Sequence, residues 1–534
     1  MSTKAGADRF VRFGIGAAAA VAAAWFPGAA LAQLRVANWN VTNYSSGRVT
    51  DFQTAIYGVV PVPLPLAGRS LSPDIILGEE FVSAAGVGNF LSLLNTAPGS
   101  PGDWAAAPFI DGPDSDSAFF YRTSKIAYIG TTIISQVTGS TSLPPRNTYR
   151  YDMTLKGYAV VPGTRLACYA THMKAGSSPD DQARRLLEAN KIRDNAAGFD
   201  TNGAGTALPG GVAFLLGGDF NIQSSGQAAY QRLVGSETNN AGRLFDPIVT
   251  PGSWNNNGTY SFVHTQDPST TGTGGMDDRH DQILLCSALI DGDGFDYFGN
   301  PAAPYSTTTW NDPNHSYRCW GNDGTSFDTP LRTFGNTMVG PAIAQALINT
   351  ANAGGTSGGH LPVVLELRVP PVVATSGSAV DFGVVRVGQA ASADLGVSNA
   401  GDTARWTAPG IAPLTYSLSA PPGFTAPGGT FTALAGAGPN THTLGMSTLA
   451  PGPLSGTLIL SDNDPASPVV SVNLAGLVLC GADFNADTTV DDFDYFDFLN
   501  AFFAPDLSAD VNGDTSVDDF DYFDFLNAFF APCP

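Results

Sequence analysis

The chain is poor in cysteine and in basic residues, and both shortages narrow the classes of protein to which it can belong. It has 5 Cys in 534 residues, so disulfides cannot be the main source of its stability. Its 25 Lys and Arg stand against 47 Asp and Glu, for a net charge of −22. No segment has the excess of Lys and Arg expected of a protein that holds nucleic acid by phosphate neutralisation alone, although a local basic groove is compatible with the sequence.

Helix-forming Lys and Glu are scarce, whereas the 61 Gly and 38 Pro favour turns and strands. An all-helical protein is therefore disfavoured. A chain of this length, with 43% apolar residues, has core material for about three domains. The acidic charge is uneven, because residues 480–534 hold 13 Asp and no Lys, Arg or Glu, which leaves 34 acidic against 25 basic residues before them.

The N-terminus has the pattern of a secretory signal peptide at 1–32. Basic residues precede an apolar stretch at 13–26, and the small-residue site Ala-Leu-Ala ends at Ala32. We expect cleavage there and a secreted or cell-surface protein. The alternative, a membrane anchor, is disfavoured because the apolar stretch is short and a strand-like run follows it directly; no later segment could span a bilayer.

The five cysteines fall into two groups. Cys480 and Cys533 bracket the acidic tail and are placed to pair. Cys168 and Cys286 lie in apolar strand-like runs, where buried free thiols are the simpler interpretation, and Cys319 has no evident partner. Sequence alone does not decide whether two of the latter are bridged.

Apolar strand-like runs alternate with loops and a few helical patterns between residue 34 and about residue 367. The clearest helix is predicted at 179–197, where Asp180 and Asp181 suit a helix N-terminus. This pattern predicts an α+β domain at 33–369, in which two packed sheets are flanked by helices.

Four short strings in this region carry the polar side chains of one candidate site: Trp39-Asn40, Glu80 at the end of PDIILGEE, GGDFN at 217–221, and Gly-His-Leu-Pro at 359–362. In their chain order and their attachment to strand-like runs they resemble the endonuclease/exonuclease/phosphatase superfamily, which uses a divalent metal to cleave phosphoester bonds. The resemblance covers residues 34 to about 367 and implies that superfamily's two-sheet α/β sandwich.

Asn40 and Glu80 are the candidate ligands of the catalytic ion. Each ends a predicted strand, and hard cations such as Mg²⁺ or Mn²⁺ prefer carboxylate and amide oxygens. The resemblance implies the same role, since the matching Asn and Glu line the metal site of the family. Glu79, next to Glu80, is an alternative for the carboxylate.

Asp219 and Asn221 form the most specific motif. Both follow a buried strand-like run, and Gly217 and Gly218 let the backbone approach a substrate closely. The resemblance implies that this Asp orients or deprotonates the attacking water and that this Asn holds a phosphate oxygen.

His172 and His360 complete the candidate catalytic set. An imidazole can protonate the leaving oxygen and, as imidazolium, can stabilise charge in the transition state. Asp281 matches the family Asp that bonds to one of these histidines and fixes its tautomer. Tyr121 matches a Tyr that contacts phosphate, although an edge-strand Tyr explains it nearly as well.

The chain departs from the family pattern before His360. The family has Ser-Asp-His, whereas this chain has Gly358-Gly359-His360 and lacks that carboxylate. Three outcomes are open: the ion binds more weakly, Asp278 or Asp281 replaces the missing acid, or the protein has lost activity.

The strand pattern changes after Pro370-Pro371. Residues 370–479 read as short alternating strands with turn residues between them, which predicts an all-β sandwich. The segment resembles the immunoglobulin-like modules of bacterial surface and secreted proteins. It has no cluster of catalytic residue types, so we expect a spacer or binding module.

Residues 480–534 contain a unit that is duplicated at a period of 27 residues. Positions 1, 3, 5, 9 and 12 of a calcium loop fall on Asp483, Asn485, Asp487, Asp491 and Asp494 in the first copy, and on Asp510, Asn512, Asp514, Asp518 and Asp521 in the second. An aromatic helical pattern follows each loop. The tail resembles dockerin modules, which implies a small helical domain that binds Ca²⁺ and a protein partner.

The loops depart from an EF-hand at two positions. Position 6, usually Gly, is Thr488 or Thr515, and position 12 is Asp, as in dockerins. The alternative is an acidic tail with no fixed ion site. Because 13 carboxylates without a base repel one another, we expect the tail to need cations in order to fold.

These patterns predict a secreted, metal-dependent phosphoesterase, with an extracellular nuclease as the first choice of substrate class. The alternatives are a phosphatase or sphingomyelinase-like phosphodiesterase, and a non-catalytic surface or assembly protein on the same fold. Nucleic acid or another phosphoester is the expected substrate.

Overall fold

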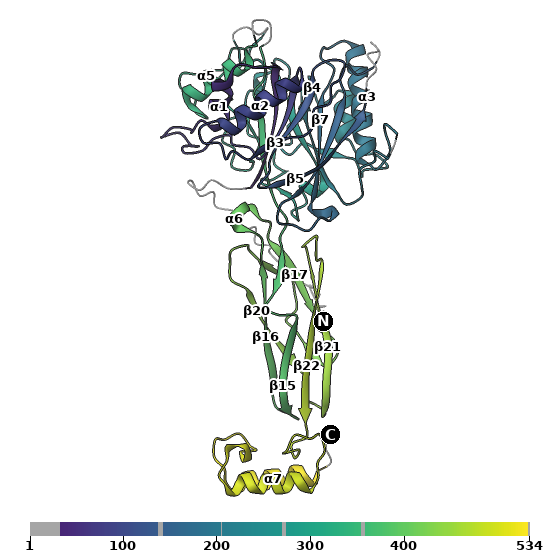
Figure 1. The fold of residues 1–534 in the computed structure, drawn as a ribbon, viewed down its shortest axis with the longest axis vertical. Coiled ribbons are helices and arrows are strands. Elements are labelled where there is room, and N and C mark those ends of the chain that lie inside the picture. Colours follow the sequence, from purple (N-terminus) through teal and green to yellow (C-terminus); the bar gives the residue numbers. More distant parts are fainter. Residues whose placement is uncertain (1–32, 137–142, 204, 270–273, 354–357, 532–534) are drawn as a thin grey trace, which may run out of the picture.

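The computed structural model describes residues 33–136, 143–203, 205–269, 274–353 and 358–531. They form three bodies in a row: a mixed α/β body, a long β body and a pair of short helices at the C-terminal end (Figure 1). The predicted signal peptide at 1–32 lies outside the described residues. Within these ranges, no helix is both long enough and apolar enough to cross a membrane.

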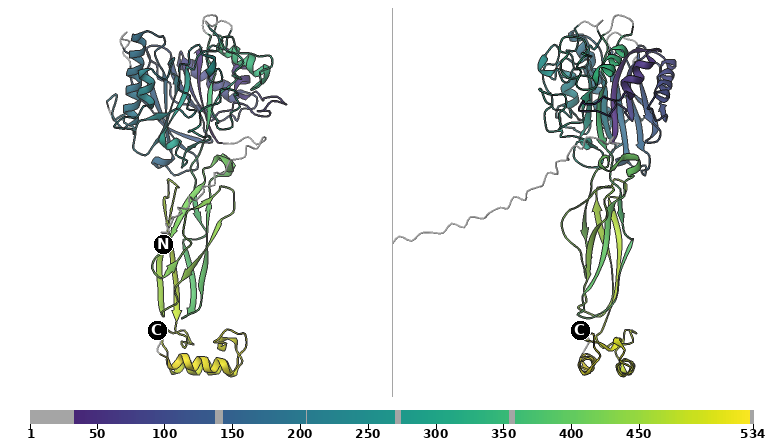
Figure 2. Two further views of the ribbon diagram at one scale, coloured as in Figure 1. Left: turned by 180° about the vertical axis from the view of Figure 1, so that it is seen from behind. Right: turned by 90° about the vertical axis from the view of Figure 1, so that its left-hand side faces the viewer.

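The α/β body contains two sheets with helices on their outer sides (Figure 2). Sheet A runs in the order β11 (Asp296–Tyr297), β13 (Val363–Arg368), β1 (Leu34–Tyr44), β2 (Ile75–Phe81), β4 (Asp116–Arg122) and β3 (Trp104–Ala106), with β12 (Arg318–Cys319) also paired to β13. Sheet B runs in the order β5 (Ile126–Ser135), β6 (Thr148–Leu155), β7 (Arg165–His172), β8 (Ala213–Asp219), β10 (Asp281–Cys286) and β9 (Leu244–Phe245).

Alternation along the strands separates two hydrophobic cores. Val36 of β1 belongs to the core between the sheets, whereas Trp39 belongs to the core beneath the helices of sheet A, as expected when successive side chains point to opposite faces. Helices α1 (Val49–Tyr57), α2 (Ala84–Thr96) and α5 (Gly340–Ala351) cover sheet A, and α3 (Pro179–Ala196) and α4 (Ala228–Val234) cover sheet B.

The helix predicted at 179–197 is confirmed as α3. Ser178 caps its N-terminus, because the Ser178 Oγ accepts a hydrogen bond from the Asp181 amide at 3.2 Å and the Asp181 carboxylate accepts one from the Ser178 amide at 3.1 Å. This reciprocal capping box satisfies two amides that a helix start leaves free.

Strand direction brings several chain segments to one edge of the two sheets. β1 and β2 are parallel, as are β7 and β8, so their C-terminal ends meet. β13 and β10 run antiparallel to these neighbours, so their N-terminal ends lie at the same edge. Polar residues near the C-terminal ends of β1, β2, β7 and β8 are therefore close to polar residues near the N-terminal ends of β10 and β13.

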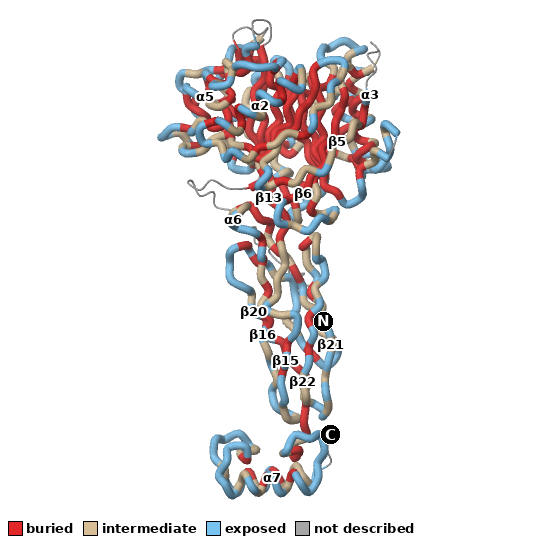
Figure 3. The backbone as a smooth tube through the Cα atoms, in the orientation of Figure 1, coloured by how far each residue is buried: buried red, intermediate tan, exposed pale blue. Residues whose placement is uncertain are grey.

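Residues 373–479 form the β body, which consists of two more sheets around a separate core. One sheet has the order β14 (Val373–Thr375), β16 (Ala391–Asn399), β20 (Asn440–Met446), β18 (Phe424–Thr425). The other has the order β15 (Ala379–Arg386), β22 (Val469–Leu479), β21 (Gly452–Asp462), β17 (Leu414–Ser419), β19 (Phe431–Ala433). Buried residues alternate with exposed ones along the strands, and the core lies between the two sheets (Figure 3).

Trp406, in the short helix α6 (Thr403–Trp406), joins the β body to the α/β body. Its side chain is fully buried and belongs to the core of the α/β body. Tyr158 donates a hydrogen bond to the Pro370 carbonyl at 2.7 Å, and Asn463 donates one to Asp293 at 2.6 Å. The junction therefore contains apolar burial as well as polar contacts.

Two helices of identical sequence, α7 (Asp492–Phe503) and α8 (Asp519–Phe530), form the C-terminal body. Their central rings stack, with the centroids of Phe498 and Phe525 4.0 Å apart. Arg386 of the β body donates hydrogen bonds to the Cys480, Gly481 and Asp483 carbonyls, so the tail is tied to the end of the sandwich.

The cysteines follow the sequence analysis where the structure describes them. Cys168, Cys286 and Cys319 are buried and free, which confirms the interpretation of the first two as buried thiols. Cys480 takes part in a disulfide. Its predicted partner, Cys533, lies outside the described residues.

Candidate active site

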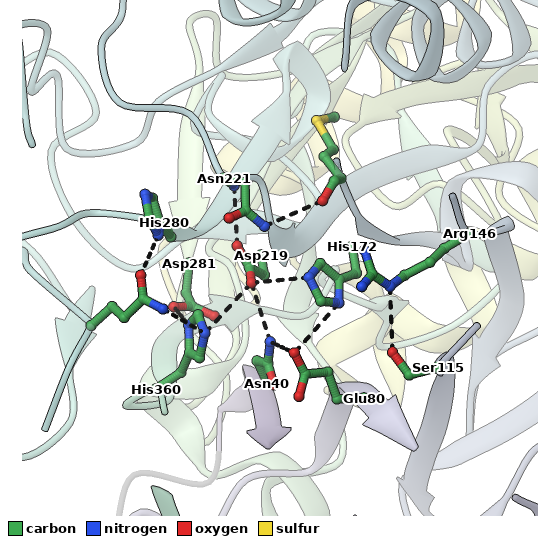
Figure 4. Close-up of polar contacts among 12 residues, drawn as sticks. Asn40, Glu80, Ser115, Arg146, His172, Asp219, Asn221, His280, Asp281 and His360 are labelled. Atoms are coloured by element: carbon green, nitrogen blue, oxygen red, sulfur yellow. Dashed lines mark hydrogen bonds and ion pairs between the residues drawn. The ribbon is translucent and has the colours of Figure 1, made fainter. Parts of the chain in front are cut away.

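Seven of the predicted site residues lie together at the shared edge of the two sheets (Figure 4). Sheet A supplies Asn40 from the second half of β1, where the pairing with β2 breaks, and Glu80 from near the end of β2. Sheet B supplies His172 and Asp219 from the ends of β7 and β8, and Asp281 from the start of β10. Asn221 follows β8 and His360 precedes β13.

Asp219 is the centre of this cluster. Its Oδ2 lies 3.1 Å from the Asn40 Nδ2, 3.3 Å from the His172 Nε2 and 3.6 Å from the His360 Nε2. The carboxylate is 2% exposed, and burial raises its pKa, while the His360 imidazole opposes that rise. A carboxylate with a raised pKa is a better proton acceptor, as a general base requires.

His360 is the cationic member of the pair of histidines. Its Nδ1 lies 2.7 Å from the Asp281 Oδ2, which also accepts a hydrogen bond from Thr265. Burial disfavours the charged imidazole, but the carboxylates of Asp281 and Asp219 outweigh burial and raise the pKa of His360 to about 10. His360 is therefore protonated at neutral pH and can act as an acid.

His172 has the opposite character. Burial lowers its pKa well below the usual value, and Arg146 and His360 lower it further. Its Nδ1 is 4.0 Å from the Glu80 Oε1, beyond hydrogen-bond distance. The neutral imidazole can donate one hydrogen bond and accept another. Of these two histidines, only His360 is therefore cationic.

Glu80, and not Glu79, is the carboxylate that reaches the cluster. The Glu80 backbone adopts a left-handed conformation with φ of 64° at a bulge of β2 against β4, which is costly for a residue with a side chain. Glu80 Oε1 accepts a hydrogen bond from Asn40 at 3.0 Å. Glu79 is fully buried below the edge, and neither of its carboxyl oxygens has a hydrogen-bond partner in the described parts of the chain.

Asn221 is fixed beside Asp219 by its own backbone. Its amide donates to the Asp219 Oδ1 at 3.1 Å, its Nδ2 donates to the Met173 carbonyl at 3.2 Å, and its φ is 51°. Its side-chain oxygen is the atom left to face a ligand. Like Glu80, Asn221 is held in a strained conformation at the edge of the sheet.

Tyr121 does not lie in the cluster, and the sequence prediction for it was wrong. β4 runs antiparallel to β2, so Asp116 pairs near Phe81 at the site edge, whereas Tyr121 pairs with Ile75 at the opposite end. Tyr121 instead stacks on Phe119 and Tyr128. Tyr121 is a structural residue, but not the edge-strand Tyr of the alternative interpretation, because β4 lies between β2 and β3.

The glycine before His360 is required by the local fold. Gly359 has φ of 65°, and a Cβ there would lie 2.5 Å from the Ala351 carbonyl oxygen at the end of α5. No side chain at this position could point into the cluster. Asp278 contacts His280 at 3.6 Å rather than His360, and Gln266 occupies the place beside the His360 Nε2, at 3.3 Å.

Three polar residues near the cluster were not predicted. Gln266 bridges His360 and His280, and its Oε1 accepts a hydrogen bond from the His280 Nδ1 at 2.6 Å. Arg146 and Ser115 lie beyond His172 (Figure 4). None of the three lies in a string that resembles the family, so only the meeting of loops in space reveals them.

The donor set at the edge fits a hard divalent ion. The Glu80 Oε1 and Asp219 Oδ2 lie 3.0 and 3.1 Å from the same Asn40 nitrogen. Turning the Asn40 amide over, at the loss of its contact with the Thr42 amide, would place its oxygen beside the Glu80 carboxylate, and Mg²⁺ or Mn²⁺ prefers such oxygen ligands. Within the described ranges, no three His, Cys, Asp or Glu side chains form a metal site by themselves.

In each of the two acidic loops of the tail, the carboxylate of one Asp accepts hydrogen bonds from backbone amides of the same loop. In the first, Asp494 accepts hydrogen bonds from the Phe484, Asn485 and Asp491 amides. In the second, Asp521 makes the equivalent contacts with residues 511, 512 and 518. Thr488 and Thr515, at the position where calcium loops have Gly, have φ of 75° and 76°, the conformation that Gly normally supplies.

No family model and no curated protein matches the chain. Among solved structures, the human Nocturnin catalytic domain is 12% identical, with a TM-score of 0.33 over 63% of this chain and 94% of that one. A humanized D. rerio TDP2 is 12% identical, with a TM-score of 0.34 over 63% and 100%. An endonuclease/exonuclease/phosphatase family protein from Bacteroides thetaiotaomicron is 15% identical, with a TM-score of 0.31 over 63% and 97%.

Proposed function

We propose that the protein is a secreted metal-dependent phosphoesterase of the endonuclease/exonuclease/phosphatase superfamily, and that it acts as an extracellular nuclease. The observation that carries this proposal is the convergence of Asn40, His172 and His360 on the Asp219 Oδ2 within 3.1 to 3.6 Å. These residues come from chain segments up to 320 positions apart. A buried carboxylate surrounded by imidazoles and amides is costly to fold, which favours a catalytic role.

The roles follow from the protonation states. Asp219 takes the proton of the attacking water, and the cationic His360 protonates the leaving oxygen. The neutral His172 donates a hydrogen bond to a phosphate oxygen. Asn221 does the same once its side-chain amide is turned over, so that Nδ2 leaves the Met173 carbonyl and faces the substrate. Asn40 and Glu80 would hold Mg²⁺ or Mn²⁺, which when bound would offset the negative charge that develops on the phosphate.

A panel of substrates tests the proposal. The full-length protein is incubated with plasmid DNA, a chromogenic phosphodiester and a chromogenic phosphomonoester, with Mg²⁺ or Mn²⁺ and then with EDTA. We expect cleavage of DNA and of the diester that EDTA abolishes. Cleavage of the monoester alone would identify a phosphatase instead, and a sphingomyelinase-like enzyme would cleave choline phosphodiesters in preference to DNA.

A non-catalytic surface or assembly protein is the rival from another class. Gly359 favours it, because the chain lacks the acid that the family has before His360. The absence of metal-dependent cleavage of every substrate in the panel would support this alternative.

For the rest of the chain we propose an immunoglobulin-like spacer at 370–479 and a dockerin-like calcium-binding module at 480–534. Ca²⁺ would bind the two acidic loops. Six exposed phenylalanines support a protein partner for the tail, since each helix presents the same three: Phe493, Phe496 and Phe503 on α7, and Phe520, Phe523 and Phe530 on α8.

A further inference from the structure

Arg146 is a fixed cation at one end of the site. It precedes β6, and Figure 4 shows its guanidinium beside His172. Its Nε donates to the Ser115 Oγ at 3.3 Å, and its Nη2 lies 3.1 Å from the Asp114 Oδ2. The side chain is 16% exposed. Its contacts with Asp114 and Ser115, two neighbouring residues of one loop, position it in the absence of a ligand.

The charge of Arg146 is available to a ligand. The Asp114 side chain is 49% exposed, and an ion pair with an exposed carboxylate is weak because water screens it. The Arg146 Nη1 has no hydrogen-bond partner among the described residues. A guanidinium whose Nη1 is free to donate can bind a phosphate, because phosphate oxygens match the planar arrangement of its N–H donors.

The position of Arg146 relative to Asp219 decides which phosphate it meets. The reacting phosphorus must lie within reach of Asp219 and His360, which are 3.6 Å apart. His172 contacts Asp219 with one ring edge, and Arg146 lies on the other side of His172 (Figure 4). Arg146 is therefore displaced along the edge of the sheets, away from the reacting group.

We propose that Arg146 is a specificity-determining residue that binds the phosphate next to the scissile one in a nucleic-acid strand. This inference rests on the proposed nuclease function. It gives the enzyme a preference for substrates with consecutive phosphates over substrates with a single phosphate. A single arginine supplies this preference without the extended basic surface that the chain lacks.

The test compares Arg146→Gln with wild type on two substrates: a short single-stranded oligonucleotide and a chromogenic diester with one phosphate. We expect KM for the oligonucleotide to rise about 10-fold or more, as for loss of a charge-assisted hydrogen bond, and KM for the single-phosphate diester to stay within about twofold. Arg146→Lys keeps the charge and loses the planar guanidinium, so its KM for the oligonucleotide should lie between the values of wild type and Arg146→Gln. Lys191→Gln removes an exposed cation on α3 and should change neither value.

Binding is measured separately, by fluorescence anisotropy of a labelled oligonucleotide in EDTA. We expect the same rise in Kd for Arg146→Gln. Equal effects on both substrates would show that Arg146 contacts the scissile phosphate, and no effect on KM or Kd would show that it binds no substrate; either result overturns the inference. A wild type that binds the oligonucleotide through Arg146 but cleaves nothing would overturn the proposed function alone.

Discussion

The Nδ1 of His360 lies 2.7 Å from the Oδ2 of Asp281, and this contact fixes which ring nitrogen faces the site. Because Asp281 holds Nδ1, Nε2 is directed at Asp219. The same contact keeps the imidazole cationic, since the Asp281 carboxylate is the chief cause that raises the pKa of His360 to about 10 against the effect of burial.

Asp281→Asn should therefore shift the pH dependence of activity. With the carboxylate removed, His360 loses its proton at lower pH, so the alkaline limb of the pH–rate profile should move to lower pH by at least about one unit. Activity at neutral pH should fall about 10- to 100-fold, as for loss of a residue that orients a catalytic group. Asp278→Asn, beside His280, is the matched control. If the alkaline limb of the profile stays in place in Asp281→Asn, Asp281 does not keep His360 protonated.

Asp219→Ala should abolish turnover without unfolding the protein. We expect a fall in kcat of about 10³-fold, typical of loss of a general base. The fold should persist, because the substitution removes a buried carboxylate and leaves the strand intact. Circular dichroism and thermal unfolding check the fold, and Asp381→Asn in the β body provides a variant with unchanged rates. Substantial activity in Asp219→Ala would refute its assignment.

The buried Glu188 should make the stability of the α/β body depend on pH. Its side chain is fully buried on α3, and burial raises its pKa to about 8, although the Lys174 amide and nearby arginines oppose the rise. The folded chain thus keeps a proton that the unfolded chain releases near the ordinary glutamate pKa of 4.5. The stabilisation is complete below that pH and is lost as pH rises through 8.

Glu188→Gln has the same shape and cannot ionise, so it should remove this dependence. Relative to this variant, the wild type should lose stability between about pH 5 and about pH 8, on the order of a few kcal/mol at about 1.4 kcal/mol per pKa unit. Thermal midpoints of both proteins at the two pH values measure the difference. The exposed Asp180 on the same helix supplies the control variant Asp180→Asn. Parallel curves for wild type and Glu188→Gln would contradict the prediction.

The tail should bind two calcium ions of nearly equal affinity, because its loops and helices are duplicates. Calorimetry on the full-length Glu80→Gln protein, which lacks a ligand of the catalytic site, should show two binding events. Asp494→Ala should remove one and Asp521→Ala the other, since each side chain organises its own loop. A titration without heat in the parent protein would reject the assignment of both loops.

The parts of the site that were predictable from sequence are those tied to strand ends. Asn40, His172 and Asp219 each end an apolar run, and parallel strands bring such ends together. Tyr121 also ends an apolar run, but its strand is antiparallel to its neighbour, which places it at the far edge. Strand direction depends on tertiary pairing and cannot be read from the run itself.

Other features depended on contacts that no local pattern encodes. Arg146 and Gln266 come from loops, whose paths are set by the surfaces on which they pack. The reason for Gly359 is likewise tertiary, because the close approach of Ala351 at the end of α5 excludes a side chain there. The choice of Glu80 over Glu79 depended on a bulge of β2 against β4, which reverses the expected alternation of side chains.

The β body leaves the α/β body from the edge opposite the candidate site. Strand β1 begins beside Leu367, near the exit to the sandwich, and Asn40 lies in its second half, toward the candidate site. The buried Trp406 stiffens that exit, and Arg386 fastens the tail at the far tip. If the tail attaches the protein to a larger assembly, the β body would hold the candidate site on the side away from that assembly, where it faces solutes in the surrounding medium.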